Sequence, residues 1–167
     1  MVTRRNILLG TAGVATVAAV GFGGVKWWGS QATAATDGAF EVTKTPEEWR
    51  KVLTPQQYAV LRDADTERAW TSPLNKEKRT GTFDCAGCDL ALFKSDTKFE
   101  SGTGWPSFYE PIEDAIGIAK DFSWGMSRDE IHCRRCGGHL GHLFKDGPKP
   151  TRLRYCINGL SLKFTPA

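Results

Sequence analysis

The sequence predicts a mainly β domain with short helices on its N-terminal side. From Gly81 onward, glycines separate short runs of aromatic and branched residues, which is typical of short strands joined by turns. Before Gly81, two Thr-Pro pairs precede short segments with apolar residues on one face, as at the starts of helices. Two Cys-x2-Cys motifs lie in the strand-rich part and indicate a structural metal site.

Two short helices are expected first. In Thr45-Pro46-Glu47-Glu48-Trp49 the threonine can cap a helix, the proline suits its first turn, and the acidic residues face the positive end of the helix dipole. Thr54-Pro55-Gln56-Gln57-Tyr58 repeats this pattern. Asp63–Lys78 then forms a polar connection, in which Thr71–Asn75 starts a brief turn.

The expected strands follow Gly81, and the last of them alternates apolar and polar residues as a half-buried strand does. They are Gly81–Phe83, Leu90–Phe93, Ile116–Ile118, Leu153–Ile157 and Leu160–Phe164. The sequence contains no internal repeat and no glycine-rich loop for a dinucleotide or a phosphate.

The first 34 residues predict export. Paired arginines, Arg4 and Arg5, precede the apolar run Ile7–Val25 and resemble a twin-arginine signal, and Ala32-Thr33-Ala34 offers a cleavage site. The run is nearly as long as the ~20 residues that span a bilayer, and Lys26-Trp27-Trp28 is typical of an anchor flank. The expected location is therefore exported: periplasmic, or membrane-anchored and facing outward.

This organisation divides the chain into residues 1–34 (export signal or membrane anchor), 35–44 (a flexible lead) and 45–167 (one domain). Residues 1–34 hold three of the 22 basic residues and none of the 19 acidic ones, so the remainder has no net charge. The remainder also lacks a basic stripe with interleaved aromatic residues. The composition therefore argues against a nucleic-acid partner.

The five cysteines form two pairs and one single residue. Cys85 and Cys88, with Cys133 and Cys136, have the spacing of two knuckles that hold one tetrahedral Zn²⁺. In an oxidising compartment the same pairs could instead be disulfides. Cys156 is left as the one thiol free for chemistry.

If residues 154–158 are extended, Arg154, Cys156 and Asn158 share one face, while Leu153, Tyr155 and Ile157 face the core. An arginine beside a thiol favours the reactive thiolate, and an asparagine amide can hold a polar group near the sulfur. The alternative is a buried, inert cysteine in a strand.

Upstream of Cys156, the segment from Gly138 to Gly147 contains His139, His142 and Asp146. A histidine can donate a proton near neutral pH, and a carboxylate can fix its tautomer. Zinc ligation by one of the histidines is the alternative, although four cysteines already fill a tetrahedral site.

The Gly/Pro loop Ser101–Phe108 places Trp105 and Phe108 where they form either an apolar wall for a methyl group or part of the core.

Three segments together closely resemble the methionine-R-sulfoxide reductase family, over a match that runs from Glu47 to Thr165. They are Ser101-Gly102-Thr103-Gly104-Trp105-Pro106-Ser107-Phe108, His139-Leu140-Gly141-His142-Leu143-Phe144-Lys145-Asp146-Gly147-Pro148 and Leu153-Arg154-Tyr155-Cys156-Ile157-Asn158. The resemblance implies two small antiparallel sheets in a tent-like arrangement, short N-terminal helices and a structural zinc away from the active site. It also implies reduction of the R epimer of methionine sulfoxide, mainly in oxidised proteins or peptides, and a repair role under oxidative stress.

By that resemblance Cys156 is the nucleophile, which becomes a sulfenic acid during the reaction. The other catalytic residues implied are Arg154, His142, Asp146 and Asn158, and those implied to bind substrate are Trp105, His139, Phe108 and Phe144.

Position 103 departs from the family pattern. Many members carry a cysteine there that attacks the sulfenic acid, whereas this chain has Thr103 and no spare cysteine. The expectation is a monomeric one-cysteine enzyme whose sulfenic acid is reduced by an outside thiol, either a thioredoxin-like protein or a small thiol. Two other functions stay open: a zinc-ribbon binding module with an inert Cys156, and a thiol peroxidase that acts on peroxides.

Overall fold

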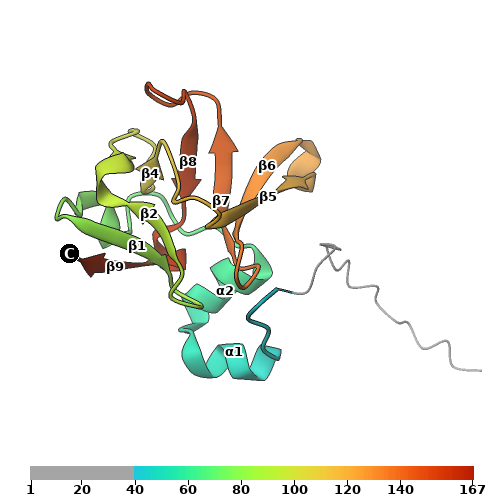
Figure 1. Cartoon of the computed structure of the whole chain (residues 1–167). Helices are drawn as coiled ribbons and strands as arrows, with labels where there is room; N and C mark the ends of the chain where they lie inside the picture. The colour runs from blue at the N-terminus through green and yellow to red at the C-terminus, as the bar shows by residue number, and fades with distance from the viewer. Residues whose placement is uncertain (1–39) are drawn as a thin grey trace, which may run out of the picture. The chain divides into compact units, whose positions relative to one another are not determined.

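The structure, a computed structural model, describes residues 40–167 (Figure 1). The expected export segment, residues 1–34, lies outside the described residues. Within residues 40–167, no helix has both the length and the apolar character needed to cross a membrane. Two antiparallel sheets and two short α-helices make up this part, so the predicted mainly β class is confirmed.

The helices α1 (Pro46–Val52) and α2 (Pro55–Asp63) begin where the sequence predicts. The Thr45 hydroxyl accepts a hydrogen bond from the Glu48 N–H (3.3 Å), and the Glu48 carboxylate accepts one from the Thr45 N–H (2.8 Å). Thr54 and Gln57 form the same reciprocal cap. Each cap satisfies backbone donors that a helix start otherwise leaves free, which stabilises these short helices. The two helices lie at one end of the domain (Figure 1).

A three-stranded sheet has the order β2-β1-β9, and a six-stranded sheet has the order β3-β4-β8-β7-β6-β5. Every pair is antiparallel. The strands are β1 (Gly81–Cys85), β2 (Ala91–Lys94), β3 (Lys98–Phe99), β4 (Ser107–Phe108), β5 (Ile116–Asp121), β6 (Arg128–Cys133), β7 (His139–Phe144), β8 (Arg154–Ile157) and β9 (Leu162–Pro166). Four short 3-10 turns join them: η1 (Pro73–Lys76), η2 (Ser95–Thr97), η3 (Ser123–Gly125) and η4 (Gly159–Ser161).

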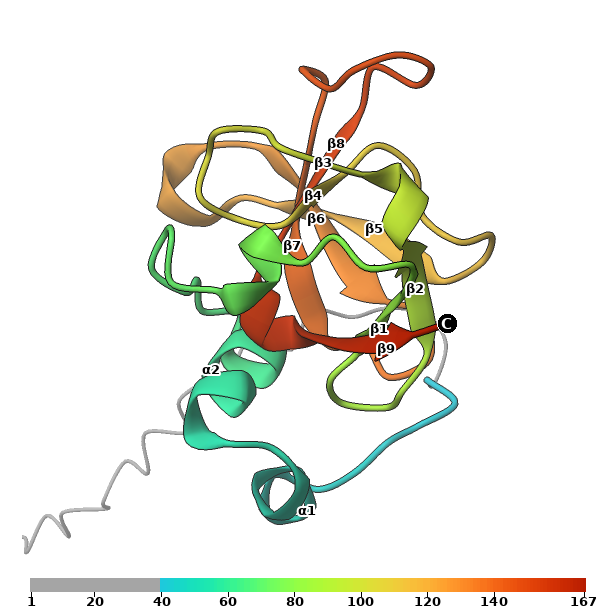
Figure 2. The same ribbon diagram turned by 90° about the vertical axis from the view of Figure 1, so that its left-hand side faces the viewer.

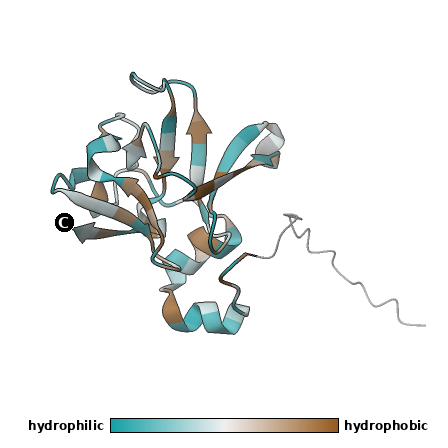
Figure 3. Cartoon of the chain, viewed as in Figure 1, coloured by the Kyte–Doolittle hydropathy of each residue, from teal (hydrophilic) through white to brown (hydrophobic). Residues whose placement is uncertain are grey.

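Aromatic side chains join the two sheets. Phe83 and Phe93 come from the small sheet, and Phe108 and Tyr155 come from the large one. Phe93 stacks on Phe108 with a centroid distance of 4.3 Å, and Phe83 meets Phe108 edge-on at 4.9 Å. Such pairs bury large apolar areas in favourable geometries. The banding of hydrophobic and hydrophilic residues along the strands in Figure 3 fits sheets with one face in this core.

Two local predictions differ from the structure. The strand expected at Leu160 begins only at Leu162, because the chain first makes the turn η4. The lead expected at residues 35–44 is described from Phe40 onward and has no helix or strand, yet it contacts the domain. The Val42 N–H donates to the Arg135 carbonyl (2.9 Å), and Phe40 lies edge-on to His132.

Candidate active site

Cys156 lies on β8, near the middle of the large sheet (Figure 2). Its neighbours across the sheet are His142 on β7 and Ser107 on β4. Tyr155 and Ile157, on either side of it in the chain, are buried in the core. The predicted alternation along this strand is therefore confirmed, and it places the sulfur on the opposite face.

A pocket of about 140 Å³ brings together most of the predicted site residues. Since one water molecule occupies about 30 Å³ of liquid, this pocket has room for the end of one side chain. Its lining is mixed, with two aromatic rings and several polar groups. The lining residues are Thr66, Trp105, Arg128, Gly141, His142, Phe144, Cys156 and Asn158.

Gly141 lets β7 and β8 approach at this pocket. A Cβ atom at this position would meet the backbone carbonyl of Cys156. Any other residue at this position would therefore move the histidine strand away from the thiol.

A larger hollow of about 620 Å³ lies against α2, η1 and η4. Its lining contains no cysteine or histidine, and Thr66 is the one lining residue that it shares with the Cys156 pocket. Size alone would favour the larger hollow. The chemistry lies in the smaller pocket, which is the candidate active site.

His142 is held by Asp121, the last residue of β5. The distance from His142 Nε2 to Asp121 Oδ2 is 2.9 Å, and Arg128 Nη2 donates to the same oxygen at 2.7 Å. Hydrogen bonding, first from the Ser123 N–H and then from His142 and Arg128, lowers the pKa of Asp121. Burial lowers the pKa of His142, so the ring is neutral and donates its Nε2 proton to the carboxylate.

His139 lies behind His142 and does not line the pocket. It is 4% exposed, its ring lies 5.4 Å from that of His142, and its Nδ1 lies 2.7 Å from Glu130 Oε1. The sequence predicts Asp146 as the carboxylate that fixes the tautomer of a histidine. In the structure Glu130 and Asp121 have this role. Glu130 lies on β6, which pairs directly with β7, and Asp121 lies at the end of β5, the next strand beyond β6.

Asp146 instead pairs with Arg154. Arg154 donates from Nε and Nη2 to the two carboxylate oxygens of Asp146, both at 2.9 Å, and its guanidinium lies 4.2 Å from the centroid of Phe144. Asp146 therefore acts on the site through the arginine. Burial raises the pKa of Cys156, while Arg154 and the Thr103 hydroxyl lower it. Arg154 therefore favours the thiolate of Cys156, as predicted. The effect of burial is larger, so the pKa of Cys156 is higher than the ordinary value for a thiol.

Glu67 organises the other side of the pocket. Its N–H donates to the Asn158 side-chain oxygen (3.0 Å), and its carbonyl accepts from Trp105 Nε1 (3.1 Å). Its buried carboxylate accepts from the Gly159 and Leu160 N–H groups at 2.5 and 3.0 Å. One residue therefore positions both Asn158 and Trp105.

Phe108 corrects one prediction. It is fully buried, stacked on Phe93 and absent from the pocket lining, so the core alternative holds for it. Phe144 and Trp105 line the pocket, as expected of an apolar wall.

The sequence does not predict five residues of the site: Thr66, Glu67, Asp121, Arg128 and Glu130. The sequence around them has no motif, because their roles depend on which strands become neighbours. The one available signal is that Glu67 and Thr66 fall in a polar connection long enough to reach the site.

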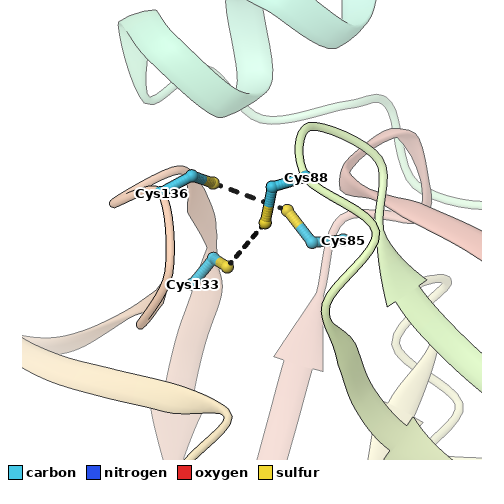
Figure 4. A group of neighbouring side chains, drawn as sticks. All are labelled: Cys85, Cys88, Cys133 and Cys136. Carbon is cyan, nitrogen blue, oxygen red and sulfur yellow. Dashed lines mark hydrogen bonds between the residues drawn. The ribbon is translucent and has the colours of Figure 1, made fainter. Parts of the chain in front are cut away.

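The remaining four cysteines form one cluster (Figure 4). Their sulfur atoms lie within 4.8 Å of one another, with 3.7 Å between Cys85 and Cys136 and 3.5 Å between Cys88 and Cys133. Shared hydrogen bonds lower the pKa of Cys88 and raise that of Cys85. Four sulfurs that converge from two knuckles fit a tetrahedral metal ion. No histidine belongs to this cluster.

The fold and these two sites are those of a mainly β protein with a pocket lined by a single cysteine and a separate cluster of four cysteines that could hold a metal ion. The sequence model of the SelR domain matches residues 53–166. A peptide methionine sulfoxide reductase MsrB of Leptospira interrogans is 58% identical over 126 residues, which cover 75% of this chain and 96% of that protein.

Proteins of the same name in Pseudomonas putida and Methanosarcina barkeri are 57% and 56% identical over 127 and 124 residues. These alignments cover 75% and 74% of this chain, and 96% and 87% of the relatives. The chain belongs to the SelR family of peptide methionine sulfoxide reductases.

Proposed function

We propose that this protein reduces the R epimer of methionine sulfoxide in oxidised proteins and peptides, with Cys156 as the nucleophile. The observation that carries the proposal is the lining of the Cys156 pocket. Trp105 and Phe144 offer an apolar side for the methyl group, and His142, Arg128 and Asn158 offer a polar side for the oxygen. These two sides orient the substituents of a chiral sulfur, so that one epimer presents its sulfur to Cys156. The choice of R follows the family.

The reaction balances without an external proton. The Cys156 thiol passes its proton to the sulfoxide oxygen, and the resulting thiolate attacks the sulfoxide sulfur to form a sulfur–sulfur bond. That bond and the S–O bond of the sulfoxide then break as the hydroxyl group passes to Cys156, and methionine leaves as a thioether. Cys156 becomes a sulfenic acid, a two-electron oxidation that matches the reduction of the sulfoxide. Burial, which raises the pKa of Cys156, keeps this proton available until the attack.

The reductant comes from outside the chain. The other four cysteines are in the metal-binding cluster, and the side chain in the resolving position is Thr103. Two thiols of a thioredoxin-like protein, or two molecules of a small thiol, return Cys156 to a thiol and release water and a disulfide. We propose that the protein works as a monomer, because one chain already supplies Cys156 together with both the apolar and the polar side of its pocket.

The metal ion in the four-cysteine cluster is proposed to be Zn²⁺. Its ligands would be Cys85, Cys88, Cys133 and Cys136, and its role would be structural. Export by a twin-arginine signal, with residues 1–34 then cleaved or kept as an anchor, would let the metal site close before the thiols meet an oxidising compartment. Replacing Arg4 and Arg5 with lysine in the full chain tests this. The proposal expects the protein to stay in the cytoplasm, and unchanged export would refute it.

The assay that tests the activity uses separated R and S sulfoxide epimers with wild type and Cys156→Ser. Wild type should reduce only the R epimer, and the serine variant neither. After one turnover without reductant, mass spectrometry should find a dimedone adduct on Cys156 and no internal disulfide. Peroxide turnover faster than sulfoxide turnover would favour the peroxidase instead.

A further inference from the structure

A chain of three hydroxyl groups leads from the core to Cys156. Ser107 lies on β4 directly across from Cys156 and is fully buried. Its Oγ lies 2.7 Å from Ser101 Oγ, which lies 2.8 Å from Thr103 Oγ1. Thr103 Oγ1 then lies 3.9 Å from Cys156 Sγ, within hydrogen-bond range for sulfur.

The number of protons sets the direction of this chain, because each hydroxyl has one proton to donate. Ser107 donates to the Trp105 carbonyl (3.2 Å), so it accepts from Ser101. Ser101 has then used its proton, so in its pair with Thr103 it accepts. The Thr103 proton has two acceptors within reach: the oxygen of Ser101 and the sulfur of Cys156.

When Cys156 is a thiolate, its sulfur is the stronger of these two acceptors. It has no proton to donate and accepts charge-assisted hydrogen bonds, which are stronger than neutral ones. When the Thr103 hydroxyl turns to the sulfur, Ser101 Oγ keeps a donor, since the Thr103 N–H lies 3.5 Å from it. The turn therefore leaves no group of the chain unpaired.

We propose that Thr103 is a catalytic residue whose hydroxyl donates a hydrogen bond to the Cys156 thiolate as it attacks. This rests on the proposed function and deepens it. Position 103, where the family pattern has a resolving cysteine, carries in this chain a hydroxyl group that activates the attacking thiol of Cys156. The branched side chain of threonine limits rotation about χ1, which helps to hold the hydroxyl towards the sulfur.

The electrostatics agree. Thr103 and Arg154 both lower the pKa of Cys156 against the effect of burial. The other charged or titratable groups at this site are His142 on β7, Arg128 on β6 and Asp146, which pairs with Arg154. None of these contacts Thr103 by a hydrogen bond, so a variant at position 103 leaves their pairs in place.

The test is the rate of alkylation of Cys156 by iodoacetamide in the zinc-loaded protein, measured on the Cys156 peptide from pH 6 to 10. Thr103→Val keeps the shape of the side chain and removes the hydroxyl. Near pH 7 its rate should fall about tenfold, the effect of losing one hydrogen bond to a charged group. The rates should converge at high pH, where the thiolate forms without help. Thr103→Ser should restore most of the rate.

Thr97→Val is the matched control, because the Thr97 hydroxyl donates to the Lys94 carbonyl and the residue does not line the pocket. It should alkylate as wild type does. Equal pH profiles for Thr103→Val and wild type would overturn the proposal. If Thr103→Val melts at a lower temperature than wild type, Thr103→Ser decides: a wild-type profile supports the proposal, and a loss as large as that of valine refutes it.

Alkylation needs no sulfoxide, so the two proposals fail separately. A wild type that does not reduce R-sulfoxide refutes the proposed function and leaves the alkylation result standing. If wild type reduces R-sulfoxide normally and all the variants have the same Cys156 alkylation rates as wild type, only the role of Thr103 is refuted.

Discussion

Removing the proposed Zn²⁺ should unfold most of this domain. Cys85 and Cys88 lie at the end of β1 in the small sheet, and Cys133 and Cys136 lie at the end of β6 in the large one. A metal there links the two sheets. Structural zinc contributes about 10–16 kcal/mol in small zinc domains, whereas a whole domain is stable by about 5–15 kcal/mol. Without the metal, the sheets would be held together by their shared hydrophobic core, which includes Leu92 from the small sheet and Phe108 and Ile157 from the large one.

Even a loss of about 5 kcal/mol should lower the melting temperature by about 15 °C or more. Circular dichroism melting with and without a chelator measures this, and added Zn²⁺ should restore the transition. Cys156→Ser should respond as wild type does, because its sulfur is not in the cluster. A structural role for the metal is refuted by two results together. The mass of the metal-free protein would be lower by four hydrogen atoms, as two disulfides require, and its melting temperature would not change in the presence of chelator.

Four further results are expected. Glu67→Ala should lower the free energy of unfolding by about 2–4 kcal/mol in urea, because two backbone N–H groups of η4 lose their acceptor, and an unchanged value would contradict its positioning role. Thr103→Cys should form a disulfide with Cys156 after one turnover, since the replaced oxygen lies 3.9 Å from that sulfur; a persistent dimedone adduct would argue against this geometry. Phe108→Ala should cost about 3–5 kcal/mol as a core cavity yet leave KM near wild type at low temperature, and a large rise in KM would return Phe108 to the substrate site. The lowered pKa of Asp121 means that its contribution to stability is complete above its unfolded pKa of about 3.9 and is lost as the pH falls below it; the stability difference between wild type and Asp121→Asn should therefore shrink from pH 6 to pH 2, and a constant difference would contradict the assignment.

The sequence predicts this fold well where the signal is local. The threonine caps at Thr45 and Thr54 fix both helix starts, and alternation places Tyr155 and Ile157 in the core. Four strands of the large sheet, β3, β4, β6 and β7, are not predicted; β3 and β4 have two residues each, and β6 and β7 are longer. The longer two carry charged residues, histidines and glycine in place of an apolar run, because one of their faces serves the site.

The site could be predicted only as far as motifs reach. Cys156, His142 and Trp105 lie in recognisable segments and do line the pocket. Asp121 and Glu130 could not be found, because a carboxylate that pairs with a histidine across a sheet is defined by strand order and register. Asp146 was assigned to the wrong partner for the same reason: closeness in sequence to His142 counted for less than the fork geometry of Arg154.

The size of the pocket also limits the second half of the reaction. In the proposed reaction, the sulfenic acid forms on a sulfur that lines a hollow of about 140 Å³, with Trp105 and Phe144 beside it. A folded protein cannot enter this space, so a protein reductant must present its thiol on a protruding segment, and a small thiol can diffuse in. Both must use the space that the methionine side chain has occupied. Methionine therefore leaves before the reductant attacks, and Cys156 alternates between two partners that never bind together.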